Sequence, residues 1–294
     1  MNHRLPGGTD RPENLLAGHA ATLALVDRWG AGFAAVAVSN SDGVLGRHGD
    51  TTRVVPVASI TKLASAWAVL LAVEEGALAL DDPAGPPGST VGHLLCHAGG
   101  LDFDTDRVLA PPGTRRIYSN TGYEALAAHL ERATGMAFAD YLAEGVLGPL
   151  GMASTELRGS AAKDLHSCVD DLLALLDELR SPRLLDPSTA ATACSPRFPK
   201  LAGVLPGWGR QDPCPWGYGP EIKGTKNPHW TGTTAPAATF GHFGGSGTFL
   251  WLDPVGVGIR GGLGCVVLTD RAFGDWAVTA WPPFSDAVRL AFTG

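Results

Sequence analysis

Residues 59–76 read SITKLASAWAVLLAVEEG and have the composition of one long helix. No charged side chain occurs from Leu63 to Val73, so this helix should be buried on every side, at the centre of the fold. Gly76 is a typical residue for the end of a helix. Residues 54–58 directly before it are strand-like, which puts Ser59 where a strand passes into a buried helix.

Ser59 and Lys62 form an S-x-x-K pattern at the start of this helix. Residues three apart on a helix share a face, so Lys62 Nζ can reach Ser59 Oγ. The free N–H groups and the positive dipole end of the helix favour an anionic intermediate there. An ammonium group in apolar surroundings loses its proton more easily, which lets Lys62 act as a base. The sequence therefore indicates Ser59 as a nucleophile.

The same pattern recurs as Ser160 and Lys163, in a polar segment that begins with glycine. We interpret this second copy as a solvated helix start. The G-x-S-x-G elbow of many serine hydrolases does not occur in the chain, which argues against an α/β-hydrolase.

Two further segments carry residues suited to acyl-transfer chemistry. Tyr118-Ser119-Asn120 follows the turn residues 111–113 (PPG), so a phenol that can shuttle a proton lies on a turn close to an amide that can hold a substrate carbonyl. Residues 242–247 (HFGGSG) precede a strand-like run, and their glycines allow a substrate to approach the backbone. The N–H groups of Gly245 and Ser59 could together form an oxyanion hole.

These segments resemble three ordered motifs of class C β-lactamases, DD-peptidases and family VIII carboxylesterases. The matching residues are Ser59 with Lys62, Tyr118 with Asn120, and His242 with Gly244. The flanking segments LLCHAGGL (94–101), VLGPLGM (146–152) and GHFGGSGTFLWLDP (241–254) also follow the family pattern. The resemblance covers nearly the whole chain and is densest over residues 54–157.

The resemblance implies an α/β fold of the α+β type, in which an antiparallel sheet is flanked by helices and an all-helical domain is inserted. We expect the sheet domain to comprise residues 1–78 and 215–294 and the helical domain residues 79–214, with the active site between them. It also implies that Ser59, Lys62 and Tyr118 are catalytic, with Tyr118 activating the deacylating water. Asn120, His242, Gly244 and Gly245 would then bind the substrate.

One position departs from the best-known β-lactamases. Their third motif reads K-T-G, whereas this chain has His242-Phe243-Gly244. A histidine is mostly neutral near pH 7, and phenylalanine has no hydroxyl group to bind the carboxylate of a β-lactam. We therefore expect small neutral esters to be better substrates than penicillins or cephalosporins.

Composition limits the partners and cofactors of the protein. The formal charge of −7 argues against nucleic acid, and no apolar run approaches the length of a membrane helix. The chain has five cysteines, an odd number, with no CxxC spacing, so structural disulfides are not expected and a reducing compartment is favoured. The N-terminal segment does not have the pattern of an export signal. We expect a cytoplasmic protein with no cofactor. His93, Cys96 and His97 lack a further spaced ligand set, so we expect no metal.

Other parts of the chain predict the remaining elements. We expect a first helix capped by Asn14 and ending near Trp29, strands over residues 33–38 and 43–47, and helices over 123–135, 137–147 and 170–179. Strands over 216–222, 247–252 and 264–269 and a closing helix over 284–292 complete the prediction.

The sequence favours a serine hydrolase that acts through an acyl-enzyme on a small ester or amide. A true β-lactamase or D-amino-acid peptidase is the first alternative, because relatives with nearly the same residues act on these substrates. A binding or sensor protein that retains the fold without activity is the second. The sequence does not indicate the oligomeric state.

Overall fold

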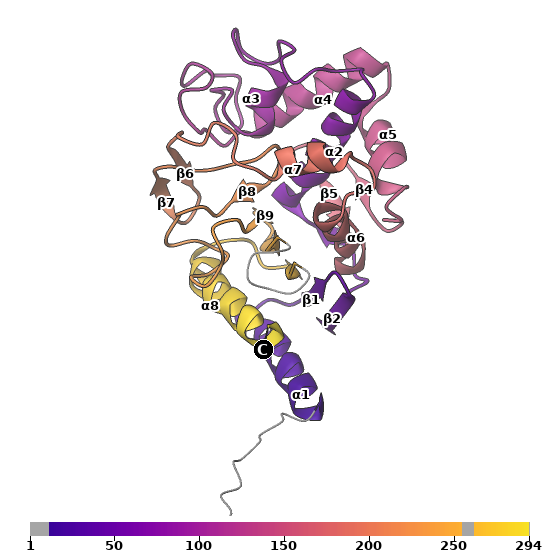
Figure 1. Ribbon diagram of the computed structural model, residues 1–294, viewed down its shortest axis with the longest axis vertical. Coiled ribbons are helices and arrows are strands. Elements are labelled where there is room, and N and C mark those ends of the chain that lie inside the picture. Colours follow the sequence, from indigo (N-terminus) through magenta and orange to yellow (C-terminus); the bar gives the residue numbers. More distant parts are fainter. Residues whose placement is uncertain (1–11, 255–261, 294) are drawn as a thin grey trace, which may run out of the picture.

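The computed structural model describes residues 12–254 and 262–293 and is built around a six-stranded antiparallel sheet (Figure 1). The strand order is β2-β1-β11-β10-β9-β8, so strands from both ends of the chain meet in one sheet. The strands are β1 (Ala34–Asn40), β2 (Gly43–His48), β8 (Glu221–Ile222), β9 (Phe240–Gly244), β10 (Thr248–Leu252) and β11 (Gly264–Thr269).

Helices cover both faces of this sheet. On one face, α8 (Asp275–Phe292) packs beside α1 (Pro12–Leu23), and Trp281 of α8 contacts Phe249 of β10. On the other face, α6 (Val169–Arg180) contacts β1, β10 and β11. Neighbours along a strand alternate between faces. Phe243 is paired with Phe249 and therefore shares the α8 face, whereas His242 faces the opposite side.

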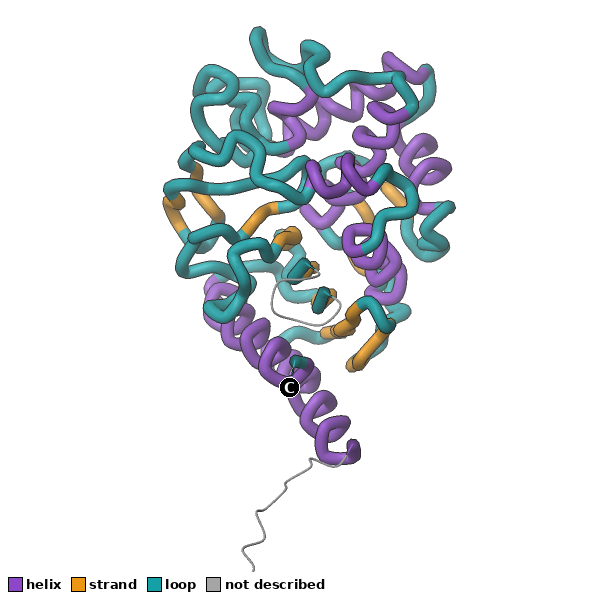
Figure 2. The backbone as a smooth tube through the Cα atoms, viewed as in Figure 1, coloured by secondary structure: helices purple, strands orange, loops and turns teal. Residues whose placement is uncertain are grey.

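A second layer of helices lies beyond the sheet, at the top of Figure 1. Its centre is α2 (Thr61–Glu74), which contacts α4 and α5. The other helices of this part are α3 (Val91–Leu95), α4 (Asn120–Thr134), α5 (Phe138–Leu142) with a π-helical turn at Ala143–Leu147, and α7 (Pro187–Ala193). Small sheets accompany them: β3 (Val55–Pro56), β5 (Leu165–Ser167) and β4 (Glu156–Leu157) form one, and β6 (Gly203–Leu205) and β7 (Gly209–Gln211) form another. Long loops connect these elements (Figure 2).

The predicted central helix is present and is buried. Eleven of its residues, including Lys62 and Trp67, are inaccessible to solvent, because the segment has apolar side chains on every face. Gly76 follows it with a φ of +76°, a conformation in which glycine meets no steric penalty. The predicted fold class, an antiparallel sheet flanked by helices, is confirmed.

Several predicted boundaries were wrong. The first helix begins at Pro12, so Asn14 lies inside it, and a 3₁₀ turn (Ala24–Trp29) completes the segment. Only Glu221–Ile222 of the expected strand over 216–222 is regular. The closing helix begins at Asp275, nine residues before the predicted start, and continues through Pro282 and Pro283. The division into two domains at residues 78 and 215 stays a prediction. None of the helices in the described ranges is long and apolar enough to cross a membrane.

Candidate active site

Ser59 lies in a 3₁₀ turn (Ala58–Ile60) that joins β3 to α2. The residue before it, Ala58, has a φ of +47°, which is uncommon for a residue with a Cβ atom and marks a tight reversal of the chain. Strand β9 approaches this turn so closely that a Cβ atom at Gly244 would lie 2.3 Å from the carbonyl oxygen of Val57. Thr248 also donates a hydrogen bond of 3.0 Å to that oxygen. Glycine at position 244 therefore brings the third motif against the serine.

Lys62 is fully buried one helical turn after the serine. Its Nζ lies 3.4 Å from Ser59 Oγ and donates hydrogen bonds to Asn120 Oδ1 at 2.6 Å and to the carbonyl oxygen of Ala162 at 2.9 Å. Burial lowers the pKa of the Lys62 ammonium from 10.5 to about 7, against a smaller opposing effect of the carboxylates of Glu124 and Asp104. A substantial fraction of Lys62 is therefore neutral at physiological pH.

The second motif is fixed at the start of α4. Ser119 caps the helix by accepting a hydrogen bond from Gly122 N–H at 3.0 Å. Asn120 is buried, and both ends of its amide have partners: the oxygen accepts from Lys62, and Nδ2 donates to Asp104 Oδ1 at 2.8 Å. The structure thus places Asn120 beside Lys62 and behind the pocket that contains Ser59.

Tyr118 and His242 face each other across the pocket. Tyr118 Oη lies 3.5 Å from His242 Nε2, and His242 Nδ1 lies 2.7 Å from the carbonyl oxygen of Phe243. Because that carbonyl can only accept, Nδ1 carries the proton and Nε2 presents its lone pair to the phenol. Burial lowers the pKa of His242 from 6.5 to about 3 and raises that of Tyr118, so both side chains are uncharged at neutral pH.

His97 supports this arrangement from behind. Its ring packs 4.4 Å from that of Tyr118, and Nδ1 accepts a hydrogen bond from Ser119 N–H at 3.2 Å. Its own carbonyl oxygen accepts from Ile117 N–H at 2.9 Å. Burial holds the pKa of His97 well below its ordinary value, so the neutral ring acts as a support for the Tyr118 turn.

A small cavity of about 140 Å³ connects the motifs. Aromatic and aliphatic groups form most of its wall. The lining residues are Ser59, Phe103, Tyr118, Leu205, Pro206, Trp216, His242, Phe243, Gly245 and Phe273. Gly245 is exposed, and a Cβ atom there would meet no other atom within 4 Å, so its backbone is open to a bound molecule. Phe243 lines this cavity and also packs against Trp281 of α8.

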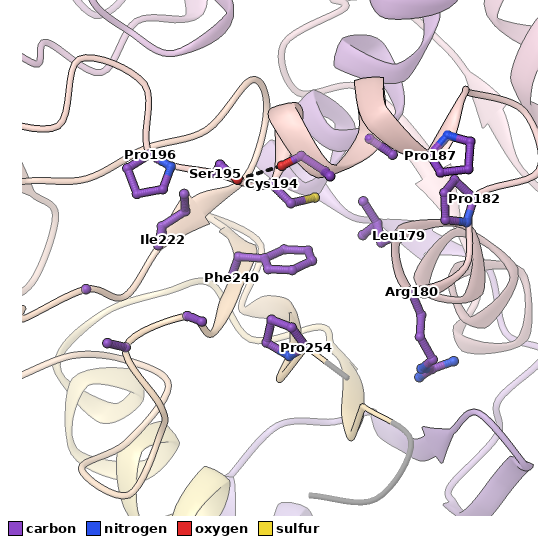
Figure 3. Close-up of a pocket in the computed structure, with 15 residues that line it drawn as sticks. Leu179, Arg180, Pro182, Pro187, Cys194, Ser195, Pro196, Ile222, Phe240 and Pro254 are labelled. Atoms are coloured by element: carbon purple, nitrogen blue, oxygen red, sulfur yellow. Dashed lines mark hydrogen bonds between the residues drawn. The ribbon is translucent and has the colours of Figure 1, made fainter. Parts of the chain in front are cut away.

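A larger cavity of about 670 Å³ lies elsewhere, between α6, α7 and β9 (Figure 3). Its wall includes Leu179, Pro187, Ile222, Phe240 and Pro254 and contains none of Ser59, Lys62 and Tyr118. The smaller cavity is therefore the candidate site, because of the two it is the one lined by Ser59, Tyr118 and His242, whereas Lys62, Asn120 and Gly244 do not line either.

The segment around Ser160 contributes to the site in a way the sequence did not suggest. The carbonyl oxygen of Ala162 accepts from Lys62, and that of Ala161 accepts from Ser65 Oγ at 2.6 Å. Ser160 itself donates to Glu124 on α4. A backbone carbonyl leaves no signal in residue types, so only the fold reveals this role.

The three residues considered for zinc have other partners. His93 Nδ1 contacts Thr90 Oγ1 at 2.9 Å, and Cys96 Sγ donates to the carbonyl oxygen of Gly92 at 3.1 Å. His97 Nδ1 accepts from Ser119. Within residues 12–254 and 262–293, no group of three His, Cys, Asp or Glu side chains is arranged to hold a metal ion.

Comparison with known proteins identifies the family of the chain. The family model described as Beta-lactamase matches residues 24–285. The chain belongs to the β-lactamase family. A β-lactamase from Mycobacterium bovis of known structure is 48% identical, has a TM-score of 0.89, and is matched over 93% of this chain and 100% of its own. The family predicted from the three motifs is confirmed.

A more distant solved structure shares the fold alone. EstCE1, described as a hydrolase with promiscuous acyltransferase activity, is 18% identical with a TM-score of 0.76, over 94% of this chain and 99% of its own. Penicillin-binding protein 4* of Bacillus subtilis is 29% identical over 140 residues, which are 36% of this chain. That match spans 31% of the Bacillus protein.

Proposed function

We propose that this β-lactamase-family protein is a serine hydrolase that forms an acyl-enzyme on Ser59 with small, neutral esters. The observation that carries the proposal is the position of Lys62, which is fully buried, 3.4 Å from Ser59 Oγ, and has a pKa lowered to about 7. A base whose pKa lies near the working pH is the most effective in proton transfer.

Acylation begins when neutral Lys62 takes the hydroxyl proton as Ser59 Oγ attacks the carbonyl carbon. Because burial raises the pKa of Tyr118, its resting form is the phenol, and Lys62 is the first proton acceptor. The N–H groups of Ser59 and Gly245 would hold the oxyanion, and removal of one such donor raises the activation barrier by about 2.7–4 kcal/mol. The proton then passes from Lys62 through Tyr118 to the leaving oxygen as the ester bond breaks.

Deacylation reverses these proton movements. A water molecule attacks the acyl carbonyl, and Tyr118 with Lys62 accepts its proton while the bond to Ser59 Oγ breaks and Oγ regains a proton. His242 Nε2 accepts the phenol hydrogen bond, which keeps the Tyr118 oxygen oriented toward the serine.

The polarity of the cavity supports a neutral substrate. His242 is uncharged, and Phe243 offers no hydroxyl group, so the third motif provides no charged donor for a carboxylate. Arg116 does not supply one, because its guanidinium is buried and donates to the carbonyl oxygens of Cys96 and Cys214. A substrate carboxylate in this cavity would lack such a hydrogen bond, and one hydrogen bond to a charged group contributes about 1.5–3 kcal/mol to the binding free energy.

A β-lactamase is the second candidate, favoured by the 48% identity to the Mycobacterium bovis protein. Purified protein should be assayed with 4-nitrophenyl butyrate, nitrocefin and a D-Ala-D-Ala peptide, with Ser59→Ala as the control. We expect the highest kcat/KM for the butyrate and none for the variant. A higher kcat/KM for nitrocefin would make the protein a β-lactamase, and no turnover of any substrate would favour a binding protein.

A further inference from the structure

The loop before the second motif is docked on the start of α4. Leu101 and Val108 form an isolated antiparallel β-bridge at the base of the loop. Asp102 N–H donates a hydrogen bond of 2.9 Å to the carbonyl oxygen of Arg107. The carbonyl oxygen of Phe103 accepts from Asn120 N–H at 2.7 Å. These bonds hold the next residue, Asp104, beside the side chain of Asn120.

The side chains of Asp104, Asn120 and Lys62 form a chain of hydrogen bonds. Asn120 Nδ2 donates to Asp104 Oδ1 at 2.8 Å, and Asn120 Oδ1 accepts from Lys62 Nζ at 2.6 Å. An amide can present either end to a neighbour, but a carboxylate only accepts hydrogen bonds. The carboxylate of Asp104 therefore fixes the amide with its oxygen toward the lysine.

This orientation matters most when Lys62 is neutral. A neutral amine has one lone pair, and that lone pair must be directed to the Ser59 proton for Lys62 to act as a base. An amide turned by 180° would donate its N–H to the same lone pair and occupy it. The amide oxygen cannot compete in this way, because it only accepts.

We propose that Asp104 is a positioning residue for the lysine base: it holds the Asn120 amide so that the lone pair of neutral Lys62 stays available to Ser59. The catalytic part of this proposal rests on the proposed function, whereas the orientation of the amide does not. Asp104 does not line the cavity that contains Ser59, so its effect is transmitted through Asn120.

The charge of Asp104 has a separate effect on Lys62, through its pKa. Asp104 and Glu124 favour its charged form, and Lys163, whose Nζ lies 3.9 Å from Asp104 Oδ1, opposes it. The other titratable side chains packed against it are Tyr118 and Tyr123, whose ring centroids lie 4.7 and 5.4 Å from Nζ, and the histidines His97 and His242, both neutral at pH 7. Loss of the Asp104 charge should therefore lower the pKa of Lys62.

Two substitutions separate the charge from the hydrogen bond. Asp104→Asn has no charge and can still accept from Asn120 Nδ2, although its own amide can also donate to a turned Asn120, whereas Asp104→Ala removes both the charge and the acceptor. Asp106 is exposed in the same loop and supplies matched controls, Asp106→Asn and Asp106→Ala, with the same change in net charge. All four proteins would be compared with wild type by pH profiles of kcat and KM for 4-nitrophenyl butyrate.

For Asp104→Ala we expect kcat to fall about tenfold with KM little changed, since the lost interaction acts on the base. Asp104→Asn should recover part of kcat, because its amide fixes Asn120 only when its oxygen faces Nδ2, and its acid limb should move to lower pH by about half a unit. The Asp106 variants should match wild type. Equal kcat values and pH profiles for the Asp104 and Asp106 variants would overturn the proposal.

A second measurement does not depend on turnover. The side-chain amide resonances of Asn120, assigned by their loss in Asn120→Ala, would be followed by NMR against pH in a Ser59→Ala background. They should titrate near pH 7 with Lys62, and Asp104→Asn should shift that titration to lower pH while Asp106→Asn should not. An unshifted titration would contradict the role of Asp104, whereas the expected shift in a protein without hydrolase activity would refute only the proposed function.

Discussion

The side-chain nitrogen of Lys62, in the first turn of the buried helix α2, lies 3.4 Å from the hydroxyl oxygen of Ser59 in the turn before that helix. Both residues are held from outside that helix. Gly244 of strand β9 packs against the turn that contains the serine, and the lysine donates a hydrogen bond to the carbonyl oxygen of Ala162. The pair is thus preorganised before a substrate binds, and its chemistry depends on whether Lys62 can lose a proton.

Replacement of Lys62 by arginine keeps a positive charge that does not dissociate near neutral pH. We expect Lys62→Arg to lower kcat/KM for 4-nitrophenyl butyrate about 10³-fold, because general-base catalysis of this kind contributes 10²–10⁴-fold. Lys200→Arg, an exposed position outside the cavity, is the control and should stay near wild type. Activity within a factor of three of wild type for Lys62→Arg would show that the lysine is not the base.

The pH dependence follows from the protonation of the same residue. Burial lowers the pKa of Lys62 to about 7, and only its neutral form can accept the Ser59 proton. Below this pKa kcat/KM should fall about tenfold per pH unit, and above it the rate should level off. The measurement is hydrolysis of 4-nitrophenyl butyrate from pH 5 to 9, corrected for the uncatalysed rate. A profile that is flat from pH 5 to 8 would contradict the assignment.

The third motif should control the preference between esters and β-lactams. Phe243→Thr supplies a hydroxyl group to the cavity, and one hydrogen bond to a carboxylate is worth about 1.5–3 kcal/mol, or roughly 10- to 100-fold in kcat/KM. We expect the ratio of nitrocefin to butyrate turnover to rise by that factor. Phe243→Leu, which adds no hydroxyl group, should leave the ratio near the wild-type value.

The Phe243 experiment requires a check on folding. Its ring packs against those of Trp208, Trp230, Phe273 and Trp281, so truncation should also lower the free energy of unfolding by about 3 kcal/mol. The kinetic comparison should therefore be made at a temperature where both variants are folded. An unchanged ratio in folded Phe243→Thr would mean that this position does not select the substrate.

A buried ion pair behind the cavity wall should stabilise the fold. Glu221 is buried with Lys226, and it also accepts hydrogen bonds from His229 and from Trp230 Nε1. Burial is the largest single effect and opposes its ionisation, but the Lys226 charge, together with His229 and the hydrogen bonds from both residues, outweighs it and holds the pKa of Glu221 well below its usual range. A depressed carboxyl pKa stabilises the folded state above the unfolded pKa of about 4.3, and this contribution is lost as the pH falls below that value.

Glu221→Gln leaves the Lys226 charge buried without a counter-charge. We expect the free energy of unfolding, measured by urea at pH 7, to fall by about 3–5 kcal/mol. Glu156→Gln is the matched control, because Glu156 pairs with Arg158 on the exposed surface and should cost less than about 1 kcal/mol. Similar losses for the two variants would mean that the buried pair contributes no more than a surface pair.

The sequence predicted those features that depend on local patterns. The apolar run after Ser59 could only form a buried helix, and the order of the three motifs identified the family. Strand β9 was not predicted, because residues 240–244 (FGHFG) are rich in glycine and lack a clear alternation. The early start of α8 was missed because Pro282 and Pro283 normally interrupt a helix.

Contacts between distant segments were out of reach of the sequence. Ala162 acts through a backbone carbonyl, which every residue possesses. Asp104 is one of three aspartates in residues 102–106, and nothing in the sequence distinguishes it from the other two. Their roles arise only when the fold brings residues 104, 120 and 162 around Lys62. The catalytic residues remain predictions until their chemistry is measured.

The most direct measurement is the site of covalent modification by a fluorophosphonate probe, which reacts with activated serine nucleophiles. The labelled protein would be digested and the adduct located by mass spectrometry, with Ser59→Ala and Ser160→Ala treated in parallel. We expect a single adduct on Ser59 in wild type and in Ser160→Ala, and none in Ser59→Ala. An adduct on Ser160, or undiminished labelling and turnover by Ser59→Ala, would contradict the assignment of Ser59 as the nucleophile.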